Sequence, residues 1–510
     1  MSEEHTLSDH PNILILCTDQ QRADSLGCYG NAHARTPHID RLAARGMRFD
    51  NHLTPNQICC PSRGTMITGL YPRHHGMTTN GRTLYDGLAT LPGLLAEAGY
   101  ATHAVGKLHL QPIMADVSYG YPESVPFWQT GRCVDWNGPY FGYQTVDFMI
   151  GESLLATEGG HHAAWLRDYH PEVVPLYQPE AALDGPLTDL DEAWTAAVPD
   201  DRHYNTWISE RAIDFLDRTD GPFMLFVSSP DPHHPFSPPR PWADLIDPGA
   251  MPAPDAIAGE LDLMPSYVRQ RLPANWIDND APAVEQGGMT TTNDVSAESL
   301  ARATALTRGM EAQIDACFGR VLATLDARGL TENTIVIFTS DHGEFLGNHG
   351  LLHKGPPPYG DLTRVSFIMA GPGVPPGEMT RAPSSHLDIM ATTLDLAGVD
   401  HHGIRDDGLS LKPALEGREL EREARFLEFH PRIDPRTYNH SMVTDDWRLT
   451  LYPESDEDWG ELFDLNADPG EHRNLFHEAR HRATRDRLAE VLTQRFTARP
   501  RAGTELIAKW

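Results

Sequence analysis

A short run near residue 59 combines a potential nucleophile with a cation and a helix start. Residues 59–69 read CCPSRGTMITG. Pro61 suits a first helical turn, where its missing amide hydrogen costs nothing, and Arg63 lies one turn beyond Cys59. Because a helix N-terminus favours anionic oxygens, Cys59 is placed for chemistry on an anionic group. Two simpler interpretations stay open: a buried, inert thiol pair, and an arginine that serves only as a structural ion-pair partner.

Further polar residues of chemical interest follow four short apolar runs. They are Asp19 after residues 12–18, Lys107 and His109 after 101–106, His233 and His234 after 223–229, and Asp341 and His342 after 334–340. Near-continuous apolar runs of this length indicate strands buried on both faces, hence a mostly parallel sheet with helices on either side. Ligands bind beyond the carboxyl ends of such strands. We therefore expect these residues to gather at one edge of the sheet.

Periodicity outlines the elements around these strands. A helix is predicted to begin at Thr36-Pro37, and a long amphipathic helix is predicted from Ser296 to Arg328, stopped by Gly329. The apolar stripe of the long helix is interpreted as core. Residues 111–202 and 237–299 are rich in Pro, Gly, Asp and Trp without a period. We expect these two segments to form loops that shape substrate access.

The length of 510 residues exceeds what one core usually serves, so two domains are expected. After about residue 405 the pattern changes to short alternating runs, such as WRLTLY at 447–452, which is typical of an α+β unit. We predict a catalytic α/β domain at 11–404, with a large mostly parallel sheet sandwiched by helices. A smaller C-terminal α+β subdomain with an antiparallel sheet, followed by a tail, is predicted at 405–510.

Composition excludes several partners. The net charge is -31, from 41 basic and 72 acidic residues, so nucleic acid is not an expected partner. No apolar run approaches the roughly 20 residues of a membrane span. The first residues, MSEEH, are acidic and unlike a secretory signal, and six cysteines are too few for a disulfide framework in so long a chain. We therefore expect a cytoplasmic enzyme whose local cations attract an anionic substrate.

Read from Cys59, the pattern C-x-P-S-R followed by T-G resembles the segment that type I sulfatases present to the formylglycine-generating enzyme. Cys60 does not fit this register. The step G-K-x-H at 106–109, the later lysine at 354, and E-L-x-D-L at 461–465 also resemble this family of the alkaline phosphatase superfamily. The resemblance spans residues 11 to about 475. It implies an alkaline phosphatase-like fold and an arylsulfatase-like sulfuric ester hydrolase whose nucleophile is the formylglycine hydrate made from Cys59.

The resemblance also implies the parts of the site. One divalent metal ion would be held by Asp19, Asp341, His342 and the residue 59 hydrate, and buried carboxylates after apolar runs would otherwise be costly. The remaining implied roles are Arg63 beside the nucleophile, Lys107 on the oxyanion and residue 59, Lys354 with His233 at the leaving oxygen, and His109 as the base that takes a proton from the hydrate.

Four residues carry less weight in this scheme. His234 is the alternative to His233 as the histidine at the leaving oxygen, and His349 and His353 are interpreted as structural. Asn80 corresponds loosely to a substrate-binding asparagine of the phosphonate hydrolases that resemble this chain, although Asn-Gly is first of all a turn signal.

Gln20 departs from many sulfatases, which have a second aspartate directly after the first. Asp19-Gln20 together with Asp341-His342 resembles the branch that contains phosphonate monoester hydrolases and choline sulfatases. One fewer carboxylate and one imidazole make this donor set softer than an all-oxygen calcium site, so manganese becomes as plausible as calcium, and magnesium and zinc rank behind them. The alternative function is therefore a phosphonate monoester or phosphodiester hydrolase with the same machinery, promiscuous for both ester classes.

Partners follow from the same resemblance. We expect a small anionic ester as substrate and the formylglycine-generating enzyme as a partner during maturation. This branch commonly forms homo-oligomers, so a dimer or tetramer is expected, and residues 478–510 are long enough to reach a neighbour. A third hypothesis, from another class, is a binding protein whose Cys59 is never converted.

Overall fold

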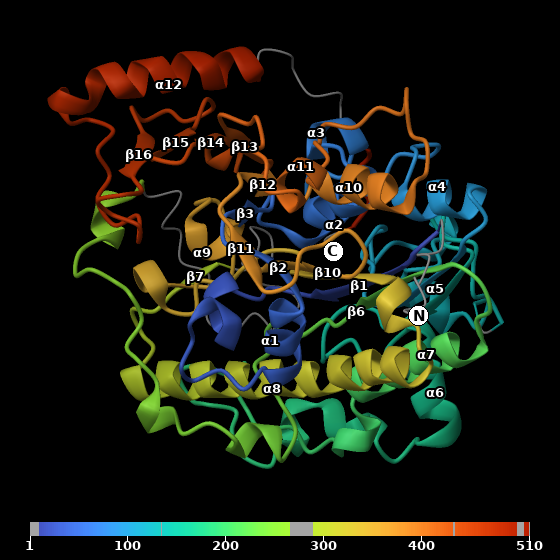
Figure 1. Ribbon diagram of the computed structural model, residues 1–510. Coiled ribbons are helices and arrows are strands. Elements are labelled where there is room, and N and C mark those ends of the chain that lie inside the picture. The colour runs from blue at the N-terminus through green and yellow to red at the C-terminus, as the bar shows by residue number, and fades with distance from the viewer. Residues whose placement is uncertain (1–9, 134, 266–288, 432–433, 497–503, 509–510) are drawn as a thin grey trace.

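A mixed sheet of eight strands forms the centre of the fold, as a computed structural model of residues 10–133, 135–265, 289–431, 434–496 and 504–508 describes it (Figure 1). In order across the sheet, the strands are β11 (Glu378–Thr380), β2 (Gly46–Phe49), β10 (Phe367–Ala370), β8 (Thr334–Ser340), β1 (Asn12–Thr18), β6 (Phe223–Ser228), β4 (Ala101–Gly106) and β5 (Thr145–Phe148). Neighbouring strands from β8 to β5 are all parallel, whereas β10 is antiparallel to β8 and β2. The predicted strands are confirmed, and the one at 223–229 ends one residue earlier.

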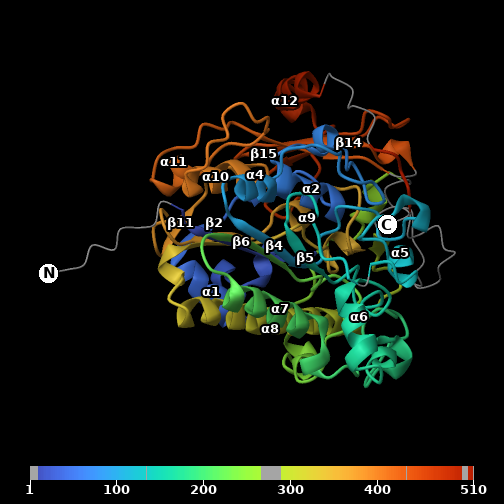
Figure 2. The same cartoon turned by 90° about the vertical axis from the view of Figure 1, so that its right-hand side faces the viewer.

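Helices cover both faces of this sheet. Successive residues of β1 alternate between two cores: Ile13 and Ile15 point to one, and Leu14 and Leu16 point to the other. The first core is completed by α2 (Cys59–Thr68), α4 (Leu91–Glu97) and α10 (Asp388–Ala397), and the second by α1 (Pro37–Ala44), α7 (Tyr204–Arg218) and α8 (Ala297–Ala327). Figures 1 and 2 show these two groups on opposite sides of the sheet. Burial on both faces explains why the strand sequences are apolar throughout.

The long helix α8 confirms the prediction for residues 296–328. Its first turn is capped by the hydroxyl of Ser296, which accepts the backbone N–H of Ser299 at 3.1 Å. Its residues Ile314 and Phe318 lie in the core beneath the sheet, as expected of an apolar stripe. Helix α1 likewise begins directly after Thr36.

A second, antiparallel sheet forms near the C-terminal end of the described chain. Its order is β13 (Arg425–Phe429), β14 (Asn439–Val443), β15 (Trp447–Leu451) and β16 (Gly460–Asp464). Helix α12 (Arg482–Arg495) covers it through Leu488 and Leu492, at the top of Figure 1. The hydroxyl of Tyr359 donates to Glu461 at 2.7 Å and joins this sheet to the catalytic part. The α+β character is confirmed, whereas the boundary at residue 405 stays a prediction.

Shorter elements complete the described chain. They are α3 (Pro72–His75), α5 (Val125–Gln129), α6 (Gly160–Tyr169), α9 (Gly360–Thr363) and α11 (Lys412–Leu415), with the strand pairs β3 (His52–Leu53) and β12 (Ser384–Ser385), and β7 (Thr290–Thr291) and β9 (Leu351–Leu352). Among the described residues, no helix is long and apolar enough to cross a bilayer. Part of the segment 237–299, namely 266–288, lies outside the described residues, so its predicted role at the substrate entrance stays a prediction.

Residues 504–508 pack against the loop 76–83 of the same chain. The N–H of Ile507 donates to the carbonyl of Gly81 at 2.9 Å, and the hydroxyl of Thr504 donates to the carbonyl of Thr83 at 2.7 Å. Gly81 has a φ of +81°, and a Cβ there would lie 1.9 Å from the carbonyl oxygen of Ala508. Only glycine therefore fits beneath this segment. The predicted reach of residues 478–510 to a neighbouring subunit stays a prediction.

Candidate active site

The carboxyl ends of the parallel strands deliver the predicted residues to one edge of the sheet. Asp19 follows β1, Asp341 and His342 follow β8, and Lys107 follows β4. Between β4 and Lys107, Gly106 has a φ of +98°, and a Cβ there would lie 1.9 Å from the carbonyl oxygen of Ser228. The close passage of the chain past β6 thus requires glycine.

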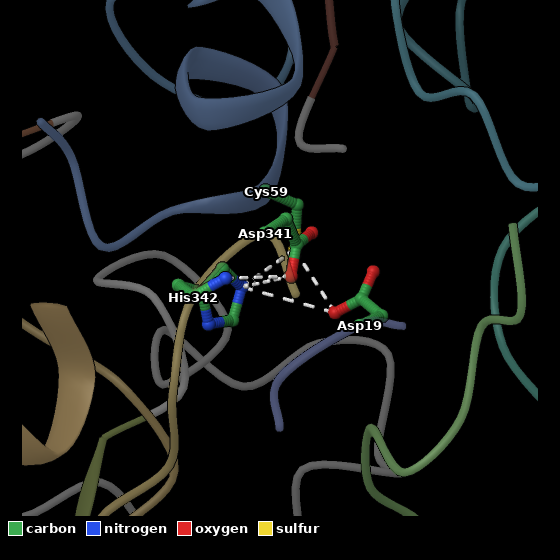
Figure 3. Close-up of side chains that lie close together, drawn as sticks. All are labelled: Asp19, Cys59, Asp341 and His342. Carbon is green, nitrogen blue, oxygen red and sulfur yellow. Dashed lines mark hydrogen bonds and ion pairs between the residues drawn. The ribbon is translucent and has the colours of Figure 1, made fainter. Parts of the chain in front are cut away.

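Four side chains converge at this edge, and Figure 3 shows them facing one another. Cys59, the first residue of α2, places its Sγ 3.2 Å from Nε2 of His342 and 3.6 Å from Oδ1 of Asp19. The same Nε2 lies 3.8 Å from Oδ1 of Asp19 and 3.7 Å from Oδ1 of Asp341. All four residues are buried. Two carboxylates, an imidazole and residue 59 form a donor set that could hold a divalent ion.

Arg63 bridges the two carboxylates from the next turn of α2. Its Nε donates to Oδ2 of Asp341 at 2.8 Å, and its Nη2 donates to Oδ2 of Asp19 at 3.1 Å. Its Nη1 also donates to the carbonyl of Lys107 at 2.6 Å. The planar fork of arginine suits this double contact. The guanidinium therefore fixes the two carboxylates relative to the helix that carries Cys59.

Two lysines supply the other cations of the site. Lys107 places Nζ 2.8 Å from Oδ2 of Asp19. Lys354 places Nζ 3.0 Å from Sγ of Cys59 and 2.7 Å from Oε1 of Gln20. Three buried cations thus face two buried carboxylates. This local excess of positive charge is the one expected of an anion site in an acidic chain.

Burial and these charges set the protonation of the site. Burial alone would raise the pKa of Asp19, but Lys107 and Arg63 hold it well below its usual range. Burial lowers the pKa of His342 to about 4. Its Nδ1 donates to the carbonyl of Gly343 at 2.9 Å, so Nε2 of the neutral ring presents a lone pair to the cluster. Burial, with Asp19, raises the pKa of the Cys59 thiol to about 11, which makes the unmodified thiol a poor nucleophile.

Family models match almost the whole chain. The sulfatase model matches residues 11–399, and a model for the C-terminal region of N-sulphoglucosamine sulphohydrolase matches residues 347–498. The chain belongs to the sulfatase family. This sulfatase is accordingly a hydrolase, and its fold is alkaline phosphatase-like.

Similar proteins come from both substrate classes. The sulfatase is 27% identical to an arylsulfatase of Clostridium perfringens, over 97% of this chain and 96% of the relative. It is 29% identical to the multifunctional alkaline phosphatase superfamily protein PehA of Trinickia caryophylli, with 95% of each chain covered. Its structure superposes on the phosphonate monoester hydrolase of Agrobacterium radiobacter with a TM-score of 0.76, at 26% identity and 95% coverage of both chains.

His109 of the sulfatase is presented by a strained turn. Its φ is +55°, and neither buried ring nitrogen has a hydrogen bond to any residue that the structure describes. The carboxylate of Glu123 accepts the backbone N–H groups of His109, Leu110 and Gln111, the last two at 2.8 and 3.2 Å. The hydroxyl of Tyr140 donates to the same carboxylate at 2.5 Å. The backbone anchor therefore holds the turn in place without using the ring nitrogens.

The two adjacent histidines at 233 and 234 face different groups. Nδ1 of His233 lies 2.5 Å from the carbonyl of His234, so the neutral ring carries its proton on Nδ1 and presents Nε2 as an acceptor. Burial, Lys354 and Lys107 hold the pKa of His233 well below its usual range. Nδ1 of His234 accepts from the amide of Gln20 at 2.9 Å. The catalytic role of His233 stays a prediction.

Asn80 supports the nucleophile helix. Its Oδ1 accepts the backbone N–H of Cys60 at 3.1 Å, within the first turn of α2. This contact stabilises a helix N-terminus. Contact between Asn80 and a substrate stays a prediction.

Sequence reasoning missed two contributors to the site. In the sequence, Gln20 marks a branch of the family by replacing a second aspartate. In the structure, its Oε1 accepts from the Lys354 ammonium, which also contacts Cys59 and His342. Its φ of +61° turns the side chain toward the cluster. The Asp-Gln step after a strand was the signal for it. Glu123 had none, because it lies in an aperiodic segment 14 residues beyond His109.

Proposed function

We propose that this sulfatase hydrolyses sulfate esters of small aryl or alkyl alcohols with an aldehyde hydrate made from Cys59. The observation that carries the proposal is the place of Sγ of Cys59, where an oxygen of the hydrate would stand, 3.2 Å from Nε2 of His342 and 3.0 Å from Nζ of Lys354. A thiol with a pKa of about 11 would stay protonated there, which favours the converted residue.

The donor set fits one divalent metal ion. Asp19 and Asp341 offer carboxylate oxygens, His342 offers the lone pair of Nε2, and Oε1 of Gln20 lies close to the same groups. Bound there, the ion would polarise the nucleophile and the nonbridging oxygens of the ester. Calcium and manganese remain the favoured ions, ahead of magnesium and zinc.

The reaction we infer is a double displacement. One hydroxyl of the residue 59 hydrate attacks sulfur, the bond from sulfur to the alcohol oxygen breaks, and the alcohol leaves with a proton from Lys354 or His233. The proton that the attacking hydroxyl loses replaces the one that this acid donated. The Nδ1-protonated state of His233 favours Lys354 as that acid. The second hydroxyl then gives its proton to His109, the carbonyl re-forms, and sulfate leaves. Water rehydrates the aldehyde, so it need not attack the ester.

A phosphonate monoester or phosphodiester hydrolase is the second candidate. The likeness to the Agrobacterium phosphonate monoester hydrolase, with a TM-score of 0.76, and to the multifunctional PehA supports it. Sulfate monoesters and phosphonate monoesters share a single charge and a tetrahedral centre, so one site can accept both.

Two measurements test the proposal. Mass spectrometry of the peptide that contains residue 59 should show the aldehyde in active protein, and an unmodified thiol there would contradict the mechanism. Cys60→Ser is the matched control, since it should keep activity while Cys59→Ala abolishes it.

Initial rates on matched 4-nitrophenyl sulfate and phosphonate esters should favour sulfate, and a clear phosphonate preference would select the second candidate.

The proposal also covers the location, maturation and oligomeric state of the enzyme. A cytoplasmic location, maturation by a formylglycine-generating enzyme, and a homo-oligomeric state as dimer or tetramer are supported by the family resemblance and the composition. Light scattering after size exclusion would determine the oligomeric state, and co-expression with a formylglycine-generating enzyme should raise the converted fraction of residue 59.

A further inference from the structure

A second cluster of metal-binding side chains lies away from the catalytic cluster. Glu260, His349 and His472 each present one ligand atom, and these atoms lie within 4.8 Å of one another. Glu260 comes from the segment after β6, His349 from the turn before β9, and His472 from the loop after β16. Strand β7, which pairs with β9, and strand β16 lie at the left of Figure 1. The cluster therefore joins the catalytic part to the C-terminal sheet.

One nitrogen of each ring converges on a single carboxylate. Nδ1 of His349 lies 2.6 Å from Oε1 of Glu260, and Nδ1 of His472 lies 3.1 Å from Oε2 of the same residue. His349 and Glu260 are buried, and His472 is 11% exposed at its side chain. Two imidazoles and one glutamate are a common donor set for zinc.

The opposite nitrogen of each ring is backed by a further carboxylate. Nε2 of His349 lies 3.4 Å from Oδ2 of Asp361, and Nε2 of His472 lies 3.1 Å from Oδ1 of Asp255. Asp361 is itself held by Arg22 at 3.0 Å. Metal-binding histidines typically have a carboxylate at their second nitrogen, which orients the ring and raises its basicity.

The other histidine cluster of the described chain shows this arrangement at only one of its two rings. His353 lies 2.6 Å from Glu192 through Nε2 and 3.9 Å from Glu344 through Nδ1. In the group of Glu192, His234 and His353, Nδ1 of His234 accepts from the amide of Gln20 at 2.9 Å. The lone pair of Nδ1 of His234 is therefore already engaged by a side-chain amide, and the neutral ring carries its proton on Nε2. In the group of Glu260, His349 and His472, by contrast, both rings have a carboxylate at each nitrogen.

We propose that Glu260, His349 and His472 bind one divalent transition-metal ion, with zinc favoured, whose remaining position is open to water. The ion links three segments that are distant in sequence. One of these segments is the loop that carries His349, and it runs from His342 to Lys354. An ion bound to His349 therefore stiffens the loop that places the Lys354 ammonium beside residue 59. The site is independent of the ester that the enzyme hydrolyses.

Metal counting tests this site without an activity assay. The full-length protein is stripped with a chelator, reloaded with zinc, passed through gel filtration and analysed by inductively coupled plasma mass spectrometry. The wild type should retain one equivalent more than His472→Ala, and Asp341→Ala should lose a different equivalent at the catalytic cluster. Asp255→Asn should weaken binding at the second site by about 10–100-fold, because it removes the carboxylate behind His472.

Controls separate a metal site from an ion-pair network. His477→Ala, an exposed histidine near the same loop, should retain the wild-type metal content. Glu260→Gln repeats the test if His472→Ala does not fold, as judged by circular dichroism. Equal zinc content in wild type, His472→Ala and Glu260→Gln would overturn the proposal and leave two imidazoles held by carboxylates. Cobalt-loaded Asp341→Ala should show visible absorption bands that the double variant with His472→Ala lacks.

Discussion

The carboxylate of Glu123 accepts the backbone N–H of His109 and so anchors the turn that carries the candidate base of the second reaction step. The same carboxylate holds the next two N–H groups, and it is buried. Because the ring nitrogens of His109 have no hydrogen bonds within the described part of the chain, the backbone rather than the side chain determines where this ring lies.

Glu123→Gln should therefore slow breakdown of the covalent intermediate more than its formation. The amide group turns a donor toward backbone donors, which costs about 1–3 kcal/mol of stability. The checks are a pre-steady-state burst and the mass of the residue 59 peptide, which should carry the retained sulfo group. Tyr140→Phe, which removes only the hydroxyl donor to Glu123, should have a smaller effect. Unchanged kinetics in Glu123→Gln would contradict the anchoring role.

Arg63→Lys should reduce both activity and metal content. Lysine can contact only one of the two carboxylates that Arg63 bridges at 2.8 and 3.1 Å, and breaking a buried ion pair typically costs about 3–5 kcal/mol. We expect a loss of kcat/KM of at least about 10²-fold and a lower Tm. Arg211→Lys, at an exposed pair with Asp214, is the matched control and should change stability by less than about 1 kcal/mol. Equal behaviour of the two variants would refute the bridging role.

Lys354→Met should discriminate between leaving groups. If Nζ protonates the departing oxygen, alkyl and phenyl esters should lose about 10²–10⁴-fold in rate. The 4-nitrophenyl ester, whose oxygen needs little protonation, should lose far less. The measurement is kcat/KM across a series of aryl esters of graded acidity. A uniform loss would show that Lys354 binds charge without transferring a proton.

Glu461→Gln should remove part of the pH dependence of stability. Burial raises the pKa of Glu461 to about 7, between the hydroxyls of Tyr359 and Tyr452 at 2.7 and 2.9 Å. The folded state thus binds this proton more tightly than the unfolded state. Its stabilising contribution is complete below the unfolded pKa near 4.5 and is lost as pH rises to about 7.

Urea unfolding of the wild type and Glu461→Gln between pH 4.5 and 8 measures this effect. The wild type should lose up to about 1.4 kcal/mol per pH unit relative to the variant as pH rises to 7, and the difference should then level off. Parallel curves for the two proteins over the whole range would mean that Glu461 titrates normally.

The strand ends made much of the catalytic cluster predictable. Asp19 and Asp341 each follow an apolar run, and parallel strands bring such positions to one edge whatever the intervening chain does. The register of Cys59 could be predicted because proline and arginine follow it at fixed spacing. The local signal was enough for these residues since each is placed by the element directly before it.

Other contacts had no local signal. Glu260 and His472 lie 212 residues apart and meet only because the C-terminal sheet packs against the catalytic part. Glu123 acts through backbone groups, which any residue carries, so nothing in the sequence of its partners points to it. The orientation of Gln20 depends on a left-handed φ that its residue type does not favour.

The sequence separation between Arg63 and Asp341 also determines when the site can form during synthesis. The two residues are 278 positions apart, so a growing chain makes Cys59 long before the carboxylate that closes the site over it. At about 5–20 residues per second, the interval is roughly 15–55 s. During that time the buried surroundings of residue 59 are incomplete, which would give a modifying enzyme access that the finished fold removes.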